Sequence, residues 1–279
     1  MLIILIGQFG PSKFYLISHL LKFYFLCILL FTFQKGALAV VSNKILKKSF
    51  PYQPPSKEIR KKYRYIFELK EKLPPRFLKS AFDKLVSLAL LFVITPLLIL
   101  IKIAFLIEGW ILPENKGPMF YYYNSVSQGK VIRKYKIRII KTSYIDPVKA
   151  KKADWVAYAS AWNPKSLTYL GRFIKKFYLD ELPQFYSVLK GEISLVGPRP
   201  LSVYHYKLDI SQGNVARKLL KGGMLGFGHI HKGYRELGNP IYEYKYLDYY
   251  LKRSSLSLLF FDLWIIWRGI KLILRGGGH

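Results

Sequence analysis

The chain has 279 residues, and its 45 lysines and arginines against 16 acidic residues give a formal net charge of +29. Such an excess implies a polyanionic partner, but 51% of the residues are hydrophobic and lie in long blocks at 14–33, 85–107 and 256–274. This combination favours anionic membrane lipid over nucleic acid as the partner, and a single cysteine, Cys27, excludes internal disulfides and cysteine metal clusters.

The first apolar block predicts a membrane anchor. Residues 14–33 are apolar and aromatic, and they are long enough to cross a bilayer. Ala37-Leu38-Ala39 resembles a signal-peptidase site behind such a block, so a cleaved signal is the alternative, although cleavage would export the rest of the protein. We expect residues 1–40 to be retained, with the lysines that follow them on the cytoplasmic side.

The second apolar block, residues 79–112, follows a basic, proline-rich segment, 41–78, that is expected to be a linker with one short helix. As a straight helix, the apolar part of the block would run roughly 35 Å, enough to cross a bilayer. Pro96 lies in its middle, where proline removes a helix hydrogen bond and bends the axis. The hydroxyl of Thr95 is available to a carbonyl freed at this break.

Basic residues occupy both flanks of this block, which favours a cytoplasmic position for both ends. A helix-break-helix hairpin that enters and leaves the same leaflet accounts for the flanks and for Pro96 together, so we predict a re-entrant membrane helix. The alternative is a spanning helix with a kink at the proline. The flanking residues are Arg76, Lys79 and Lys84 before the block, and Lys116, Lys130, Arg133, Lys134, Lys136 and Arg138 after it.

Residues 113–241 are expected to form a small cytoplasmic catalytic domain. Met119–Tyr123 and Val131–Ile140 are typical of short strands around a Gln128-Gly129 turn. The aromatic tail, residues 242–279, carries too many charges to span a membrane but suits helices that lie in the interface. The predicted fold class is therefore α+β, mostly helical and membrane-associated. The second strand alternates Arg133, Tyr135 and Ile137 with Lys134, Lys136 and Arg138.

Asp180 and Glu181 form an adjacent carboxylate pair at the start of a predicted helix. Asp180 is expected to cap that helix, where free amides and the helix dipole stabilise negative charge. An ionised aspartate can attack phosphorus to form an acyl-phosphate. Because an anion then attacks an anion, Mg²⁺ is expected, with Glu181 as its ligand beside Asp180. Taken alone, the pair is also ordinary helix-capping chemistry. The helix is indicated by Leu182, Phe185, Tyr186 and Leu189 at helical spacing, followed by Gly191.

Several cationic side chains near this pair are candidates for binding phosphate. Arg199 lies between Pro198 and Pro200, which fix the backbone, and arginine binds phosphate through two parallel hydrogen bonds. The alternatives are a rigid surface turn for Arg199 and a solvated basic face for the others. The candidate substrate-binding residues are Lys136, Arg138, Arg172, Lys175, Arg199 and Pro200.

The order of these motifs closely resembles the bacterial sugar transferases, monotopic phosphoglycosyl transferases that act on polyprenol phosphate and initiate surface-glycan assembly. The resemblance covers residues 79–275. It rests on Phe82-Asp83 before the proline-broken block, Tyr135-Lys136-Ile137-Arg138, Gly171-Arg172-Phe173, Leu179-Asp180-Glu181-Leu182-Pro183-Gln184, Val188-Leu189-Lys190-Gly191 and Leu195-Val196-Gly197-Pro198-Arg199-Pro200.

The resemblance implies transfer of a sugar-1-phosphate from a UDP-sugar to undecaprenyl phosphate, with release of UMP. Asp180 would be the nucleophile of a covalent intermediate, Glu181 would help to bind Mg²⁺, and Lys136, Lys175 and Arg199 would contact phosphates or nucleotide. The enzyme would lie at the bacterial inner membrane with its catalytic domain facing the cytoplasm. It would begin exopolysaccharide, capsule or O-antigen (lipopolysaccharide) synthesis, with downstream glycosyltransferases as further partners.

Some positions depart from the family pattern. Where Arg-Gln-x-Arg-x-Gly is usual, residues 122–127 read Tyr-Tyr-Asn-Ser-Val-Ser and contain neither arginine. Thr95 replaces the usual serine, Lys175 stands where arginine is common, and residues 222–226 read Gly-Gly-Met-Leu-Gly in place of Pro-Gly-Ile-Thr-Gly. The intact Asp-Glu pair predicts catalysis. The alternative is a catalytically weak relative that acts as a membrane-bound glycan-assembly factor.

Overall fold

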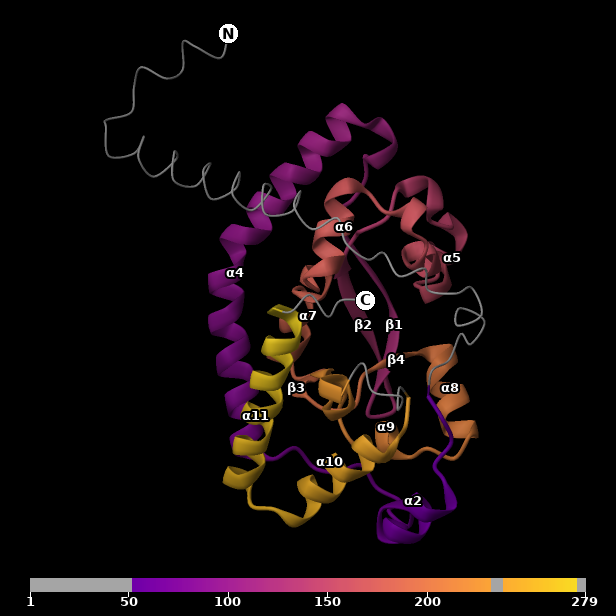
Figure 1. Ribbon diagram of the computed structural model, residues 1–279, viewed down its shortest axis with the longest axis vertical. Coiled ribbons are helices and arrows are strands. Elements are labelled where there is room, and N and C mark those ends of the chain that lie inside the picture. The colour runs from indigo at the N-terminus through magenta and orange to yellow at the C-terminus, as the bar shows by residue number, and fades with distance from the viewer. Residues whose placement is uncertain (1–51, 232–237, 275–279) are drawn as a thin grey trace, which may run out of the picture. The chain divides into compact units, whose positions relative to one another are not determined.

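A computed structural model describes residues 52–231 and 238–274 of the chain, which belong to one unit spanning 50–279 (Figure 1). The predicted anchor at 1–40 lies outside the described residues. Helices predominate beside two small sheets, so the predicted α+β class is confirmed. The helices are α2 (Lys57–Lys62), α3 (Arg64–Phe67), α4 (Phe77–Ile111), α5 (Pro147–Lys151), α6 (Tyr169–Lys176), α7 (Gln184–Leu189), α8 (Val203–Ser211), α9 (Ala216–Leu219), α10 (Ile241–Lys252) and α11 (Ser255–Leu274). The strands are β1 (Phe120–Ser127), β2 (Lys130–Ile137), β3 (Ser194–Val196), β4 (Leu201–Ser202) and β5 (Gly223–Leu225).

Strands β1 and β2 form the predicted antiparallel hairpin, with ends that differ from the expected ones by a few residues. Gln128 and Gly129 make the two-residue turn, and both have left-handed backbone angles, φ 49° and 69°, as the turns that suit strand twist require. Strand β4 pairs with the other edge of β1, while β3 and β5 form a separate parallel pair. The hairpin therefore fixes which side chains of β2 share a face.

The segment expected to be a linker contributes to the core. Ile59 of α2, Ile66 of α3 and Tyr63 between the two helices are buried in a cluster that also contains Tyr244 and Leu247 of α10. The prediction for residues 41–78 is a linker with one short helix. The structure differs because apolar side chains recur at helical spacing within this basic segment and pack into the core. Helix α10 also buries its apolar side chains in this core. Within the described part of the predicted interfacial tail, only α11 therefore has a broad exposed apolar face.

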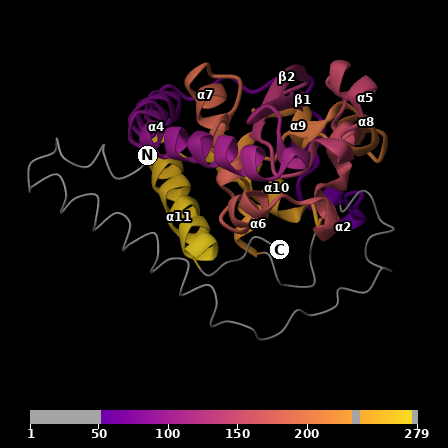
Figure 2. The same ribbon diagram turned by 90° about the horizontal axis from the view of Figure 1, so that it is seen from above.

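Helix α4 is one continuous helix of 35 residues that contains Pro96. Figures 1 and 2 show that it changes direction along its length. The helix break predicted at Pro96 is thus a bend within a continuous helix, since the helical turns before and after the proline keep their backbone hydrogen bonds. The hydroxyl of Thr95 donates to the carbonyl of Leu91 over 2.6 Å, whereas the carbonyl that proline deprives of a partner is that of Phe92, four residues earlier.

Both halves of α4 have residues that are buried against the same unit. Near its start, the Lys79 ammonium lies 2.6 Å from the Asp262 carboxylate of α11, and the Ser194 hydroxyl donates to Asp83. Near its end, Ile101 and Phe105 lie in a second buried cluster with residues of β2 and α6. A straight helix of this length would extend about 52 Å, so the bend allows both halves to contact the unit.

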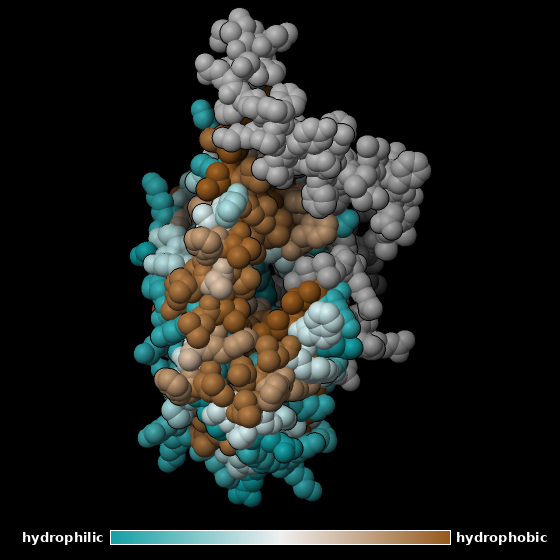
Figure 3. Space-filling view, turned by 90° about the vertical axis from the view of Figure 1, so that its left-hand side faces the viewer, coloured by the Kyte–Doolittle hydropathy of each residue, from teal (hydrophilic) through white to brown (hydrophobic). Residues whose placement is uncertain are grey.

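The middle of α4 exposes a broad apolar surface. By length and composition, α4 is the one helix among residues 52–231 and 238–274 that could cross a membrane. Figure 3 shows apolar side chains covering the face of the molecule formed by α4 and the neighbouring α11. This face is the part of the structure suited to lipid. Its exposed residues include Leu85, Leu88, Phe92, Val93, Leu100 and Ile103 of α4, and Phe260, Trp264, Trp267 and Ile270 of α11.

Candidate active site

Asp180 and Glu181, hereafter the carboxylate dyad, lie in a short 3₁₀ turn (Leu179–Glu181) between α6 and α7. Tyr178, immediately before the turn, has a left-handed φ of 55°. Helix α7 begins only at Gln184, and no side chain caps it. The prediction that Asp180 caps this helix is therefore wrong: the tight turn places its carboxylate in the interior, where a lysine pairs with it.

Two cations from different elements hold the dyad. The Lys136 Nζ atom of β2 lies 2.6 Å from Asp180 Oδ2 and 3.2 Å from Glu181 Oε1. The Arg199 guanidinium, between β3 and β4, donates to Glu181 Oε1 over 2.5 Å and to Oε2 over 3.5 Å. Both carboxylates are buried. The structure thus brings two of the candidate substrate-binding residues, Lys136 and Arg199, to the dyad.

These contacts set the charge state of the site. Burial opposes ionisation of Glu181, but Arg199 and Lys136 outweigh it and hold its pKa well below the ordinary range. Burial likewise disfavours the charged form of Lys136, and the carboxylates of Asp180 and Glu181 outweigh it and raise the pKa of Lys136. Glu181 is therefore kept anionic and Lys136 protonated at neutral pH.

One face of the β1–β2 hairpin lines this site. Tyr121 lies opposite Lys136 and Tyr123 lies opposite Lys134 in the strand register, and paired residues point to the same side of the sheet. Charges of the dyad affect both tyrosines, whose pKa values burial raises. The hairpin thus presents two tyrosines and two lysines to the carboxylates.

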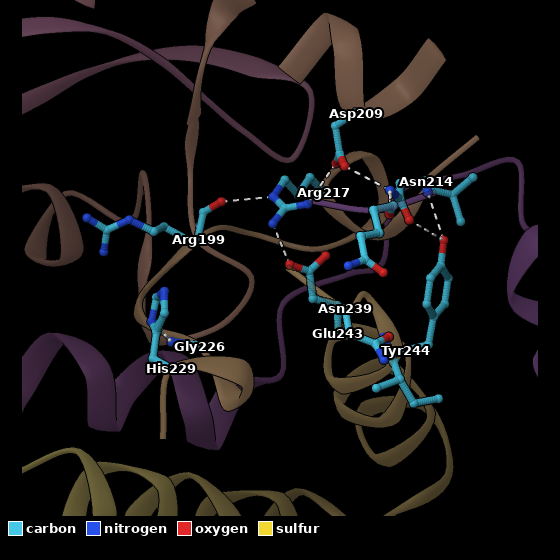
Figure 4. A network of polar contacts seen from close by, with 12 residues as sticks. Arg199, Asp209, Asn214, Arg217, Gly226, His229, Asn239, Glu243 and Tyr244 are labelled. Carbon is cyan, nitrogen blue, oxygen red and sulfur yellow. Dashed lines mark hydrogen bonds and ion pairs between the residues drawn. The ribbon is translucent and has the colours of Figure 1, made fainter. Parts of the chain in front are cut away.

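The backbone of Arg199 is fixed from behind by a buried ion network, shown in Figure 4. Arg217 of α9 donates from Nε to the Arg199 carbonyl over 3.0 Å. Its two terminal nitrogens bind Asp209 of α8, over 2.7 Å, and Glu243 of α10. The ring of Tyr52 covers the guanidinium, with its centroid 4.1 Å away. Arg217 therefore joins three helices to the turn that carries Arg199.

The other predicted substrate-binding residues lie in different environments. Lys175 is close enough to the dyad for its charge to interact with Asp180, and its ammonium donates to the Ala161 carbonyl over 2.7 Å. Arg172 is exposed and lies over the ring of Tyr169. The structure does not bring it to the dyad.

Arg138 and Pro200 have structural contacts. The Arg138 side chain is fully buried and donates to the backbone carbonyls of Asn115, Pro118 and Ile140. It braces the end of α4 against β2. Pro200 is buried against Gly222, where a Cβ atom would lie 2.5 Å from the proline ring, so a side chain at position 222 would displace the turn that holds Arg199.

Sequence reasoning did not single out Lys134 or Arg217 as site residues. The alternation on β2 could have indicated Lys134, since it shares a face with Lys136 and differs by two positions. Arg217 lies in a four-residue helix without a motif. Its partners are distant in sequence, so only the tertiary structure identifies it.

The donor set of the dyad fits Mg²⁺. Among the described residues, no group of three or more acidic, histidine or cysteine side chains is close enough to enclose a metal. Mg²⁺ usually binds through one or two protein carboxylates and completes its coordination with substrate phosphates and water. The adjacent oxygens of Asp180 and Glu181 match this pattern of partial protein ligation.

Comparison with known proteins gives a consistent picture. A sequence profile of the family described as bacterial sugar transferase matches residues 74–276. The chain is 31% identical over 216 residues to an undecaprenyl-phosphate galactose phosphotransferase of Salmonella typhimurium, which covers 73% of this chain and 42% of that protein. It is 33% identical over 194 residues to a UDP-glucose:undecaprenyl-phosphate glucose-1-phosphate transferase of Klebsiella pneumoniae, with coverage of 68% and 37%. It is 28% identical over 211 residues to a UDP-N-acetylgalactosamine-undecaprenyl-phosphate N-acetylgalactosaminephosphotransferase of Aeromonas hydrophila, with coverage of 72% and 45%. The chain spans less than half the length of these relatives.

Proposed function

This chain belongs to the bacterial sugar transferase family, and from that premise we propose that it transfers a sugar-1-phosphate from a UDP-sugar to undecaprenyl phosphate. The similar proteins are named for this reaction with galactose, glucose or N-acetylgalactosamine as the sugar. The product would be the lipid-linked first sugar of a surface glycan such as an exopolysaccharide, a capsule or an O-antigen.

The observation that carries the proposal is the buried carboxylate dyad with a cation on each side. Lys136 and Arg199 lie on separate elements and converge on adjacent carboxylates. Here Asp180 is bound through Oδ2 alone, and no hydrogen bond from a described residue reaches its Oδ1.

In the proposed reaction, an Asp180 oxygen attacks the phosphorus that bears the sugar. The bond between that phosphorus and the oxygen bridging the two phosphates breaks, and UMP leaves with the electron pair. An oxygen of undecaprenyl phosphate then attacks the same phosphorus, and the bond to Asp180 breaks to restore the carboxylate. Lys136 holds the Asp180 carboxylate in place for attack, while Arg199 holds Glu181 and would contact the phosphates.

Glu181, with Asp180 beside it, would hold Mg²⁺ when the ion and the substrate phosphates are present. The ion would supply neutralisation of phosphate charge during attack by an anion. The residues of the chain would orient the donor and exclude water around it.

The placement of α4 supports a re-entrant topology at the membrane. Residues toward each end pack against the same unit, namely Lys79 and Asp83 toward the start and Ile101 and Phe105 toward the end. A helix that crossed the bilayer from side to side would separate its ends. We therefore propose that α4 enters and leaves one leaflet of the cytoplasmic membrane, with α11 in the interface and the dyad on the cytoplasmic side.

The reaction is tested by measuring UMP release from purified, detergent-solubilised protein. The assay contains undecaprenyl phosphate, Mg²⁺ and one of a panel of UDP-sugars, and it is repeated with EDTA. We expect release with at least one donor, loss of release with EDTA, and loss in the Asp180→Asn variant. Asp146→Asn, an equivalent change at an exposed aspartate, is the matched control and should retain activity.

Absence of UMP release across the panel would contradict the proposed reaction. In that case the protein would be a member that binds within a glycan-assembly complex without turnover. The missing arginines at residues 122–127 would then be the first positions to restore.

A further inference from the structure

Lys134 is a buried lysine on the face of the hairpin that lines the dyad. It lies two positions before Lys136 on β2, so both side chains project from the same face of the strand. Its exposed fraction is 4%. Tyr123, directly opposite on β1, provides one wall and offers no charge.

Lys134 differs from the other buried cations because it has no partner within the part of the chain that the structure describes. Lys79 and Arg217 pair with carboxylates, and Arg138 donates to three carbonyls. No carboxylate, carbonyl or hydroxyl of residues 52–231 and 238–274 accepts a hydrogen bond from the Lys134 ammonium. An unpaired cation is costly to bury, so a partner from outside the chain is expected. The buried lysines and arginines of these residues are Lys79, Lys134, Arg138 and Arg217.

The surroundings of Lys134 identify the chemistry of that partner. Burial lowers the pKa of Lys134 well below its ordinary value, and the charge of Arg199 lowers it further, with Glu181 acting in the opposite direction. Its neighbours are thus the residues of the site. Lys136 and Arg199 contact the two carboxylates of the dyad, and the charges of Lys134 and Lys175 also act on them. The excess of positive charge is complementary to phosphate.

The rest of this hairpin face contributes no other cation near the dyad. On β1 the side chains that share the face are Tyr121, Tyr123, Ser125 and Ser127. The positive charge on this face comes from β2 alone, where Lys134 and Lys136 lie toward the dyad and Lys130 is exposed beside the turn. The Lys136 ammonium already contacts both carboxylates of the dyad. Of the two lysines toward the dyad, Lys134 is therefore the one whose ammonium is available to a substrate.

We propose that Lys134 is a phosphate-binding residue of the site, whose ammonium donates to a phosphate oxygen of a substrate. The assignment rests on the proposed function for the identity of the substrates. The phosphate belongs either to the diphosphate of the UDP-sugar or to the lipid acceptor. Lys134 would bind and position this group without exchanging covalent bonds with it.

The test compares direct binding of two probes, so that it does not depend on turnover. UDP is titrated into the detergent-solubilised full chain by calorimetry, and undecaprenyl phosphate is titrated in lipid nanodiscs, both with Mg²⁺. The variants are Lys134→Met, which keeps the length of the side chain without its charge, and Lys134→Arg, which keeps a cation. Lys130→Met removes an exposed charge from the same strand and is the matched control.

We expect Lys134→Met to weaken binding of one probe by about tenfold or more, since a charged hydrogen bond is lost. The weakened probe identifies the source of the phosphate. Lys134→Arg should retain most of the affinity, and Lys130→Met should bind both probes as the unmodified chain does. The melting temperature of Lys134→Met should be unchanged or higher, because the substitution removes an unpaired buried charge.

Two results would overturn the assignment. One is affinity for both probes within twofold of the unmodified chain in Lys134→Met. The other is a fall in melting temperature in Lys134→Met with equal loss of both probes, which would indicate a structural role. Failure of UMP release with intact probe binding would instead count against the proposed reaction and leave the assignment of Lys134 standing.

Discussion

Replacing Arg217 with methionine tests whether the buried ion network holds the turn that carries Arg199. The Arg217 side chain is 2% exposed, and methionine fills a similar volume without charge or donors. The substitution leaves the Asp209 and Glu243 carboxylates buried without their cation, and it frees the carbonyl of Arg199.

The magnitude follows from these contacts. Removing one partner of a buried ion pair costs about 3–5 kcal/mol, because the remaining charge is uncompensated. For a unit of this size, each kcal/mol lowers the melting temperature by about 2–4 °C, so we expect a fall of about 6–20 °C at pH 8. Asp209 keeps its hydrogen bond from Asn214 over 2.9 Å, which favours the lower part of that range.

The assay is thermal unfolding of the purified protein, together with the KM for the UDP-sugar at a temperature well below the transition. The double variant Arg217→Met, Glu243→Gln should recover part of the loss, since one of the two uncompensated charges is removed. KM should rise in the single variant because Arg199 is less well fixed. A fall in melting temperature well short of the range above, about 2 °C or less, would refute the reasoning.

Three further changes give separate tests. Lys136→Met should reduce turnover at least about a hundredfold, as measured by steady-state UMP release, because the dyad loses the donor beside its nucleophile. Activity close to that of the unmodified chain would contradict a role for Lys136 in turnover. Pro96→Ala should straighten α4 and move one of its flanks to the outer face of the membrane. Labelling of a cysteine introduced at Glu114, in a chain whose native cysteine is replaced, detects the change. Unchanged labelling would exclude Pro96 as the determinant of topology. Burial raises the pKa of Glu243 to about 7 from an ordinary 4.5, so the folded protein binds the Glu243 proton more tightly than the unfolded chain does. The contribution of Glu243 to the free energy of unfolding is therefore fully present below about pH 4.5 and is lost as the pH rises through 7. Glu243→Gln should remove this loss of about 3 kcal/mol in the free energy of unfolding, which denaturant unfolding between pH 4.5 and 8 measures. If the variant kept the same fall in stability with pH, another group would be responsible.

The elements with strong local signals could be predicted from the sequence. The alternation on β2, the Gln128-Gly129 turn and the helical spacing after the dyad each depend on neighbouring residues, and the structure contains the corresponding hairpin and helix α7. The proline-interrupted apolar block predicts a helix-break-helix hairpin; α4 is instead one continuous helix that changes direction along its length.

The differences arise where tertiary contacts decide the outcome. Asp180 follows the sequence pattern of a helix cap, but the Lys136 ammonium from β2 draws it into an ion pair instead. Arg138 shares its strand face with Lys136, yet three carbonyls bind it at the end of α4. Residues 57–67 have the charge of a linker, and a few apolar side chains suffice to place them in the core.

The proposed nucleophile is tested most directly by the intact mass of the protein after reaction with its donor. The solubilised chain is incubated with Mg²⁺ and the UDP-sugar that supports UMP release, in the absence of undecaprenyl phosphate, and is then analysed by mass spectrometry. The account predicts a mass increase equal to one sugar phosphate, located on the peptide that contains Asp180, lost on addition of undecaprenyl phosphate and never formed by Asp180→Asn. An adduct that persists in Asp180→Asn, or turnover without any adduct, would contradict it.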